Sequence, residues 1–321
     1  MRNIRSLAAC AIVLTAHPAG AAQYPEKPVR VVVPATAGGA LDVVARQLMQ
    51  KLSENTGAQF IVDNRGGAAG SIGADMVARA APDGYTLMFA SSSVLTINPH
   101  LGAKTSYDIL KSFAPVIQVG FAPNMLAVHP SLPARTAKEL IAIAKERPRA
   151  LAFASNGAGT LSHLTAALFM QQAGIEMLHV PYKSAAPAVV AAVAGEVPVI
   201  FSAYPSLAVQ VQAGKLRALA VTSAKRIAAA PAVPTVAEAA LPGFESNQWW
   251  GFYGPAGMAP ASVARLNREM NAILATDDTK KRLAAEGAEP AGGTPEELAA
   301  YHKADFERWE KVIRAGGFKR E

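Results

Sequence analysis

The chain has 321 residues, of which 51% are hydrophobic and 17% are charged, and its formal net charge is +7. This composition supplies a sizeable core and, at this length, suits two domains, which excludes a disordered tail or a fibre. The basic residues are scattered without an aromatic-interleaved stripe, so a nucleic acid is not expected as a partner, and the mild positive charge suits a small anion.

The N-terminus has the pattern of an export signal. Residues 1–5 carry two arginines, residues 7–16 are apolar, and Ala19-Gly-Ala21 offers an A-x-A cleavage site. The apolar run is too short to span a bilayer. We therefore expect a signal peptide over residues 1–22, cleavage after Ala21 or Ala22, and a periplasmic location.

Cys10 is the only cysteine of the chain. Its context, Leu7-Ala-Ala-Cys10, also resembles a lipoprotein signal, although few residues separate it from the basic end and apolar sequence continues beyond it. Cleavage at Ala22 leaves a mature chain without a thiol, which excludes disulfides and cysteine catalysis.

Short apolar runs alternate with helical patterns along the rest of the chain. Strands that are buried on both faces have such near-continuous apolar runs, so we expect largely parallel sheets covered by helices. The expected strands are Val29–Val33, Phe60–Val62, Leu87–Ala90, Met125–Val128, Leu151–Ala154, Val197–Phe201 and Leu219–Val221.

Three helix starts fit a capping box, in which a Thr side chain and a Glu three residues later cap the first turn. In the last of them Pro295 takes the first helical position. The final helix is expected to stop at Gly316 and Gly317. The three capping pairs are Thr136 with Glu139, Thr235 with Glu238, and Thr294 with Glu297.

Two stretches are interpreted as crossings between lobes, one at Phe121–Asn124 and one between Leu241 and Trp250. We therefore expect domain 1 to contain residues 23–124 and 245–321, and domain 2 to contain residues 125–244. The C-terminal helices would pack on the N-terminal lobe. A two-lobed α/β protein with a cleft fits this pattern.

Two glycine-rich stretches, Arg30–Asp42 and Leu151–His163, each have the pattern of a buried strand, a tight turn and the start of a helix. A helix N-terminus presents unpaired N–H groups and the positive end of its dipole, and glycines let a ligand approach the backbone. One such loop holds an anionic group. Two of them predict a ligand with two anionic or polar ends, held between two lobes.

A set of short motifs stands in order along the chain: Tyr24-Pro-x-Lys-Pro-Val-Arg30, Ala37-Gly-Gly39 with Asp42, Asp63-Asn-Arg65-Gly66, Gly70-x-x-Gly73, Ala81-Pro-Asp-Gly-Tyr-Thr86, His179-Val-Pro-Tyr-Lys183, Gly214-Lys-Leu-Arg-Ala-Leu-Ala220, Pro234-Thr-Val-Ala-Glu238 and Gly292-Gly-Thr-Pro-Glu296. As a set they resemble a known family, the Bug (TctC-type) periplasmic solute-binding receptors. The resemblance implies an α/β, two-lobed periplasmic-binding-protein fold with mostly parallel sheets, flanking helices and a ligand cleft. It further implies a small carboxylate or related anion as ligand and the membrane components of a tripartite tricarboxylate transporter as partners.

Carried over by position, the resemblance implies that one loop meets one carboxylate, largely through backbone groups and bridging water. A second loop and helix start would receive the other end of the ligand through hydroxyls and amides. The alternative for both loops is a tight turn without a ligand. The first loop contains Thr36, Ala37, Gly38 and Gly39, and the second contains Ser155, Asn156, Gly157, Gly159, Thr160 and Ser162. Ser91, Ser92 and Ser202 are further candidates. For Ser91 and Ser92 the alternative is a polar strand end without a ligand.

Other residues carry weaker predictions. Asp42 is interpreted as a residue that shapes the first loop, because it lies in the first helical turn. Tyr182 and Lys183 lie at the mouth of the expected cleft, with a solvated role for Lys183 as the alternative. Of Trp249 and Trp250, at least one is expected in the core, and an aromatic wall for the ligand is the alternative.

Two positions depart from the family pattern. Ser202 stands where an acidic residue is common, and Leu41 stands where Thr or Ser is common. A missing carboxylate removes a partner for a ligand ammonium group. Amino-acid ligands are therefore disfavoured.

An enzyme is the rival class of protein. Ser162 and His163 are neighbours on a helix and point in different directions, and no G-x-S-x-G motif is present. The spacing of the histidines does not support a metal site. Gly157-Ala-Gly159 lacks the third glycine of a dinucleotide-binding motif, so no cofactor is expected. His163 and His179 are interpreted as structural residues. We expect a monomeric receptor, with a signalling sensor and, less so, a secreted hydrolase as alternatives.

Overall fold

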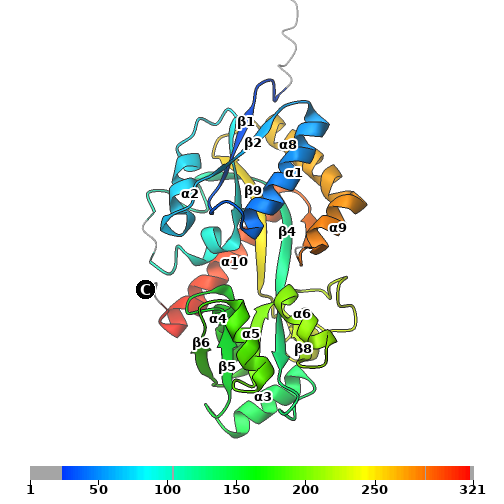
Figure 1. Ribbon diagram of the computed structural model, residues 1–321. Helices are drawn as coiled ribbons and strands as arrows, with labels where there is room; N and C mark the ends of the chain where they lie inside the picture. The colour runs from blue at the N-terminus through cyan, green and yellow to red at the C-terminus, as the bar shows by residue number, and fades with distance from the viewer. Residues whose placement is uncertain (1–23, 103–104, 286, 319–321) are drawn as a thin grey trace, which may run out of the picture.

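The computed structural model describes residues 24–102, 105–285 and 287–318. Its helices and strands form two lobes, joined by long elements that run between them (Figure 1). The strand order is β2 (Phe60–Asn64), β1 (Val29–Val33), β3 (Thr86–Ser91), β9 (Asn247–Pro255), β4 (Phe113–Val128), β7 (Val199–Ala203), β5 (Ala152–Ser155) and β6 (Leu178–Pro181), with β8 (Arg217–Val221) and β10 (Glu289–Gly292) pairing to β4. This confirms the expected two-lobed α/β fold with flanking helices.

The first lobe is built from two separate segments of the chain, one before and one after the second lobe. Its N-terminal elements are β1 (Val29–Val33), α1 (Ala40–Thr56), β2 (Phe60–Asn64), the 3-10 helix η1 (Ala68–Gly70), α2 (Ser71–Ala78), β3 (Thr86–Ser91) and the π-helix η2 (Ser93–Ile97). Its later elements are β9 (Asn247–Pro255), α8 (Pro260–Ala275), α9 (Asp277–Ala285) and β10 (Glu289–Gly292).

The second lobe is continuous in the chain. It contains α3 (Ala137–Glu146), β5 (Ala152–Ser155), α4 (Leu161–Ala173), β6 (Leu178–Pro181), α5 (Ala185–Ala194), β7 (Val199–Ala203), α6 (Tyr204–Gln212), β8 (Arg217–Val221) and α7 (Val236–Ala239).

β1 shows why the strands have continuous apolar sequences. Val31 and Val33 belong to one buried cluster with residues of α1, whereas Val32 belongs to another with residues of α2. Successive side chains of a strand point to opposite faces, so a sheet covered on both faces needs apolar residues at every position.

β4 (Phe113–Val128) is the strand shared by both lobes. Its residues 113–123 pair with β9 in the first lobe, and residues 124–128 pair with β7 and β8 in the second. The chain returns at Ser246, whose N–H donates to Thr222 O, before Asn247 pairs with Pro123. Both points lie in the stretches expected as crossings. Their use as boundaries between moving domains stays a prediction.

The expectation of mostly parallel sheets holds for the outer strands only. β1 is parallel to β2 and β3, and β5 is parallel to β6 and β7. All pairs that involve β4 or β9 are antiparallel. The reason is that β9 returns along β4 in the opposite direction, so the centre of the molecule is an antiparallel ribbon.

α10 (Pro295–Gly316) contacts the cores of both lobes. Leu298 packs in the first lobe with Val32 and Trp249, whereas Trp309 and Ile313 pack in the second lobe. A helix of 22 residues is roughly 33 Å long, enough to cross both. The expectation that the C-terminal helices pack on the N-terminal lobe agrees with α8 and α9, whose Leu266 and Leu283 lie in the first-lobe core, whereas α10 also enters the second.

The helix ends follow the expected capping chemistry. Thr294 and Glu297 form a complete capping box at the start of α10, as do Thr235 and Glu238 at α7. At α3, Thr136 accepts from the N–H of Glu139, but the Glu139 carboxylate accepts from Arg135 instead of the cap. α10 ends before Gly317, which has a φ of +63°.

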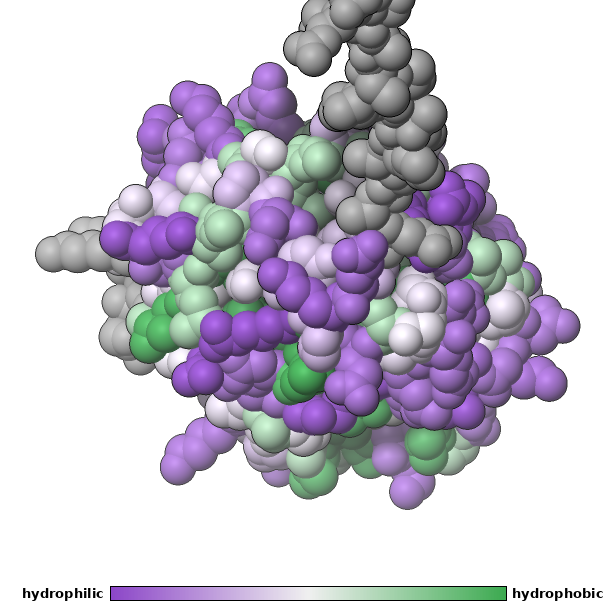
Figure 2. All heavy atoms as spheres, turned by 90° about the horizontal axis from the view of Figure 1, so that it is seen from above, coloured by the Kyte–Doolittle hydropathy of each residue, from purple (hydrophilic) through white to green (hydrophobic). Residues whose placement is uncertain are grey.

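Figure 2 views the molecule from above, onto the first lobe, whose surface is mostly hydrophilic with scattered apolar side chains. Among the helices in the described residues, none has the length and apolar character needed to cross a membrane. The expected signal peptide, residues 1–22, lies outside the described residues.

Candidate ligand-binding site

The first loop lies between β1 and α1 and is exposed over Thr36–Gly39. Gly38 adopts a φ of +82°, which favours glycine, and Gly39 caps α1 in an extended conformation. The N–H groups of the first helical turn have no partners within a helix and point toward such a loop. This geometry suits an anion that approaches from solvent.

Asp42 holds the first loop in shape, as the sequence predicted. Its carboxylate is buried and accepts from the N–H of Gly38 at 2.8 Å and from Arg46 Nε at 3.1 Å. Burial alone would raise the pKa of Asp42, but the Gly38 hydrogen bond and the Arg46 guanidinium together hold it below its usual range. The loop therefore carries a fixed internal anion, and Gly38 N–H already has a partner.

The second loop lies between β5 and α4 and is tied together by its own side chains. Ser162 Oγ accepts from the N–H of Asn156 at 2.9 Å, and Thr160 Oγ1 donates to Gly157 O at 2.7 Å. The amides of Gly157 and Gly159, predicted as donors to a ligand, donate to Ser155 Oγ and His163 Nδ1. These residues are brought together as a rigid turn at the start of α4.

The glycines of the second loop are needed for their conformation. Gly157 has a φ of +136° and Gly159 a φ of +72°. A Cβ at Gly159 would lie 3.8 Å from Leu101 Cδ1, which follows η2 in the chain. Gly159 of the second lobe therefore faces Leu101, in the segment that follows η2.

The serine candidates have different surroundings. Ser202 is buried in β7 and donates to Asn156 Oδ1 at 3.0 Å, so it supports the second loop from below. Ser92 is also buried and accepts from the N–H of Trp249 at 3.3 Å. Ser91 is partly exposed at the end of β3, where it pairs with Trp250.

The weaker predictions have clear outcomes in the structure. Trp249 and Trp250 are both buried in the core, so neither forms an aromatic wall. Lys183 is exposed, and Tyr182 is partly buried. Within the described ranges no group of three His, Cys, Asp or Glu side chains is placed to hold a metal ion.

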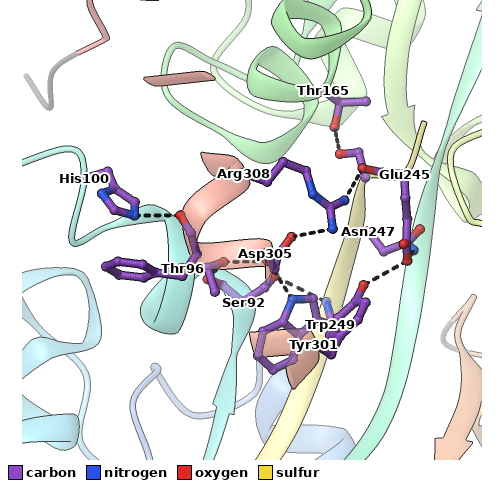
Figure 3. A network of polar contacts seen from close by, with 12 residues as sticks. Ser92, Thr96, His100, Thr165, Glu245, Asn247, Trp249, Tyr301, Asp305 and Arg308 are labelled. Carbon is purple, nitrogen blue, oxygen red and sulfur yellow. Dashed lines mark hydrogen bonds and ion pairs between the residues drawn. The ribbon is translucent and has the colours of Figure 1, made fainter. Parts of the chain in front are cut away.

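A buried polar network holds α10 against η2, β9 and the segment that precedes β9 (Figure 3). Asp305 accepts from Thr96 Oγ1 of η2 and from Trp249 Nε1 of β9, both at 2.8 Å. Arg308 lies 3.6 Å from the Asp305 carboxylate and donates to the carbonyl of Glu245. The network thus connects η2, β9, α10 and the segment where the chain returns to the first lobe.

The charge of Asp305 is held in a mostly buried position. Burial raises its pKa above the usual range, while Arg308, Trp249 and Thr96 favour the charged form. Sequence reasoning missed this network. The available signal was an acid on the buried face of α10, spaced with Leu298, His302 and Trp309.

The two-lobed α/β fold, with antiparallel strands and a helix shared by both lobes, is similar to that of the periplasmic binding protein BugD, which is 33% identical and has a TM-score of 0.67. The family model described as "Tripartite tricarboxylate transporter family receptor" (TctC) matches residues 44–318. The chain belongs to this family, which confirms the resemblance to Bug receptors.

Similar proteins, one known by sequence and two by structure, support this family assignment. The protein BugT of Bordetella pertussis is 37% identical over 305 residues, which cover 95% of this chain and 94% of BugT. R. palustris Rpa4515, solved with adipate, is 36% identical in sequence and has a TM-score of 0.71. The match covers 92% of this chain and 99% of Rpa4515. A TctC solute-binding protein from Polaromonas without ligand is 27% identical, with a TM-score of 0.84, and covers 91% and 99%.

Proposed function

We propose that this protein is exported to the periplasm as a monomer, captures a small carboxylate between its two lobes and delivers it to the membrane components of a tripartite tricarboxylate transporter. The observation that carries the proposal is the pair of loops at the N-termini of α1 and α4, one on each lobe. A ligand with two anionic ends can meet one helix N-terminus with each end. The relative solved with adipate supports this class of ligand.

The ligand is expected to bring the two lobes together. The TM-score is higher against the ligand-free Polaromonas relative, 0.84 at 27% identity, than against the adipate-bound relative, 0.71 at 36% identity. Of these two relatives, the ligand-free one has the more similar shape despite its lower sequence identity, which supports an open arrangement here. Carboxylate binding would favour the closed arrangement, in which residues 125–244 move against the rest.

Because Gly157 and Gly159 donate within their loop, the ligand donors of the second lobe are assigned to the first turn of α4. The amides of Leu161 and Ser162 lie there, next to the hydroxyl of Thr160. On the first lobe the corresponding donors are the amides that follow Gly39. Neither loop offers a carboxylate to a ligand ammonium group, since Asp42 is occupied and Ser202 stands in β7.

The test compares two glycines with similar backbone conformations. Gly159→Val places a side chain in the second loop, whereas Gly174→Val is the matched control, because Gly174 also has a positive φ, +62°, and has open space around it at the far end of α4. Both variants carry similar backbone strain. We expect adipate binding, measured by calorimetry on the mature protein, to weaken at least tenfold in Gly159→Val, about 1.4 kcal/mol.

The control variant should bind adipate as the wild type does. Equal affinities of the two folded variants would place the ligand away from the second loop. A thermal-shift screen of di- and tricarboxylates, amino acids and uncharged sugars extends the test, because a ligand of the folded state raises the melting temperature. Stabilisation by sugars or amino acids alone would contradict the carboxylate assignment.

A further inference from the structure

Three stacked rings and a fourth that packs edge-on lie next to the second loop. His163 of α4 lies parallel to His179 of β6, with ring centroids 3.7 Å apart and an interplanar angle of 11°. Phe153 of β5 stacks on the other face of the pair at 4.9 Å from His179. Phe318, which follows α10, packs edge-on against His163 at 4.8 Å.

Both imidazoles hydrogen-bond the loop above them. The N–H of Gly159 donates to His163 Nδ1 at 3.1 Å, so Nδ1 is unprotonated and the neutral ring carries its proton on Nε2. Nε2 of His179 hydrogen-bonds Ser155 Oγ at 2.7 Å. Ser155 Oγ in turn accepts from the N–H of Gly157 at 3.2 Å. The pair therefore contacts both ends of the turn that leads into α4.

The surroundings keep the stacked rings uncharged. Burial and the neighbouring His179 lower the pKa of His163 to about 4, and burial lowers the pKa of His179. Among the described residues, His179 on β6 is the titratable group that acts on His163, while α10 contributes the uncharged Phe318. A proton on Nδ1 would place two donors face to face, because the Gly159 N–H already points at that atom.

We propose that His163 and His179 are positioning residues for the ligand: the stacked pair fixes the Ser155–Ser162 loop so that the first-turn amides of α4 face the cleft. This inference rests on the proposed function of that loop. A purely packing role would be served as well by phenylalanine. The hydrogen bonds to Gly159 and Ser155 are what the imidazoles add to the stack.

Two variants of His163 separate the ring from its hydrogen bond. His163→Phe keeps an aromatic ring in the stack but removes the acceptor for Gly159 N–H. His163→Asn removes the ring but places an amide oxygen near the position of Nδ1. His129→Asn is the control for a histidine outside the loop, since His129 hydrogen-bonds Ser131 after β4.

The first readout needs no ligand. In the free protein, amide hydrogen exchange at Gly159 is expected to accelerate about three- to tenfold in His163→Phe, the value of one hydrogen bond, and to stay near that of the wild type in His163→Asn. Wild-type protection of Gly159 in folded His163→Phe would overturn the proposal, whatever the protein binds.

The second readout is adipate affinity across pH 7 to 4.5. His163→Phe is expected to bind about three- to tenfold more weakly at pH 7, with rescue by His163→Asn. The ratio of wild-type to His163→Asn affinity should fall toward acid pH, because only the wild type carries a titrating ring at position 163. His179 and adipate are present in both measurements, so the ratio largely cancels their titration. A constant ratio together with unchanged His163→Phe affinity would overturn the proposal. Absence of adipate binding to the wild type would instead count against the proposed function.

Discussion

At the scale of single residues, most polar side chains near the predicted site shape the loops. Asp42 accepts a hydrogen bond from Gly38 N–H, and Ser162 accepts one from Asn156 N–H. Ser202 donates to the side chain of Asn156. Short loops that must present backbone amides need such internal support, since an amide held in place loses less conformational freedom on binding. The sequence pattern locates these loops correctly but does not distinguish a donor to the ligand from a donor within the loop.

Replacing Asp42 tests this support. Asp42→Ala removes the acceptor of Gly38 N–H and is expected to lower the free energy of unfolding by about 1.5 to 3 kcal/mol, the value of a hydrogen bond to a charged group. Asp42→Asn keeps an acceptor oxygen and should lose less than half as much, because the exposed Arg46 contributes little to the pair. Urea unfolding measures both. Equal losses would show that the charge, rather than the acceptor, matters.

At the scale of elements, the sequence predicts those whose pattern is local. β1 was expected with its observed bounds, and the capping boxes of α7 and α10 are confirmed. β9 was missed as a strand because Asn247–Pro255 contains glycines and polar residues, and its stability comes from pairing with β3 and β4. The direction of α10 across both lobes was also missed, since a helix's apolar face does not say which core it enters.

The Asp305 network gives α10 a second kind of attachment. Asp305→Ala leaves Trp249 Nε1 without its acceptor in a buried place, whereas Thr96 Oγ1 can still donate to Ser92 O. The free energy of unfolding is therefore expected to fall by about 2 to 5 kcal/mol. Glu307→Ala, on the exposed face of the same helix, should change it by less than about 0.5 kcal/mol. Chemical denaturation followed by Trp fluorescence compares the two. Similar small losses would mean that water replaces the carboxylate.

At the scale of the whole molecule, buried histidines link stability to pH. The pKa values of His163 and His302 are lowered to about 4, by burial first. Between about pH 4 and 6.5 the unfolded chain binds protons at these sites that the folded chain does not, so stability rises with pH in this window. Asp305, whose pKa is raised, acts in the opposite direction from about pH 4 upward.

Burial also lowers the pKa values of His100 and His179, so four histidines act against the one carboxyl group of Asp305, and the melting temperature is expected to fall between pH 7 and 5. Calorimetric scans in buffers of matched ionic strength measure it. His163→Asn should flatten this dependence, and Asp305→Asn should steepen it. A wild-type melting temperature that is constant or rises toward pH 5 would contradict the assignment of neutral buried histidines.

α10 follows every other element of both lobes along the chain, yet it supplies Leu298 to one core and Trp309 to the other. Neither core is complete before this helix has left the ribosome. Under the proposed export to the periplasm, a closing element placed this late would delay tight packing in the cytoplasm. The same helix that joins the lobes would thus favour folding after translocation.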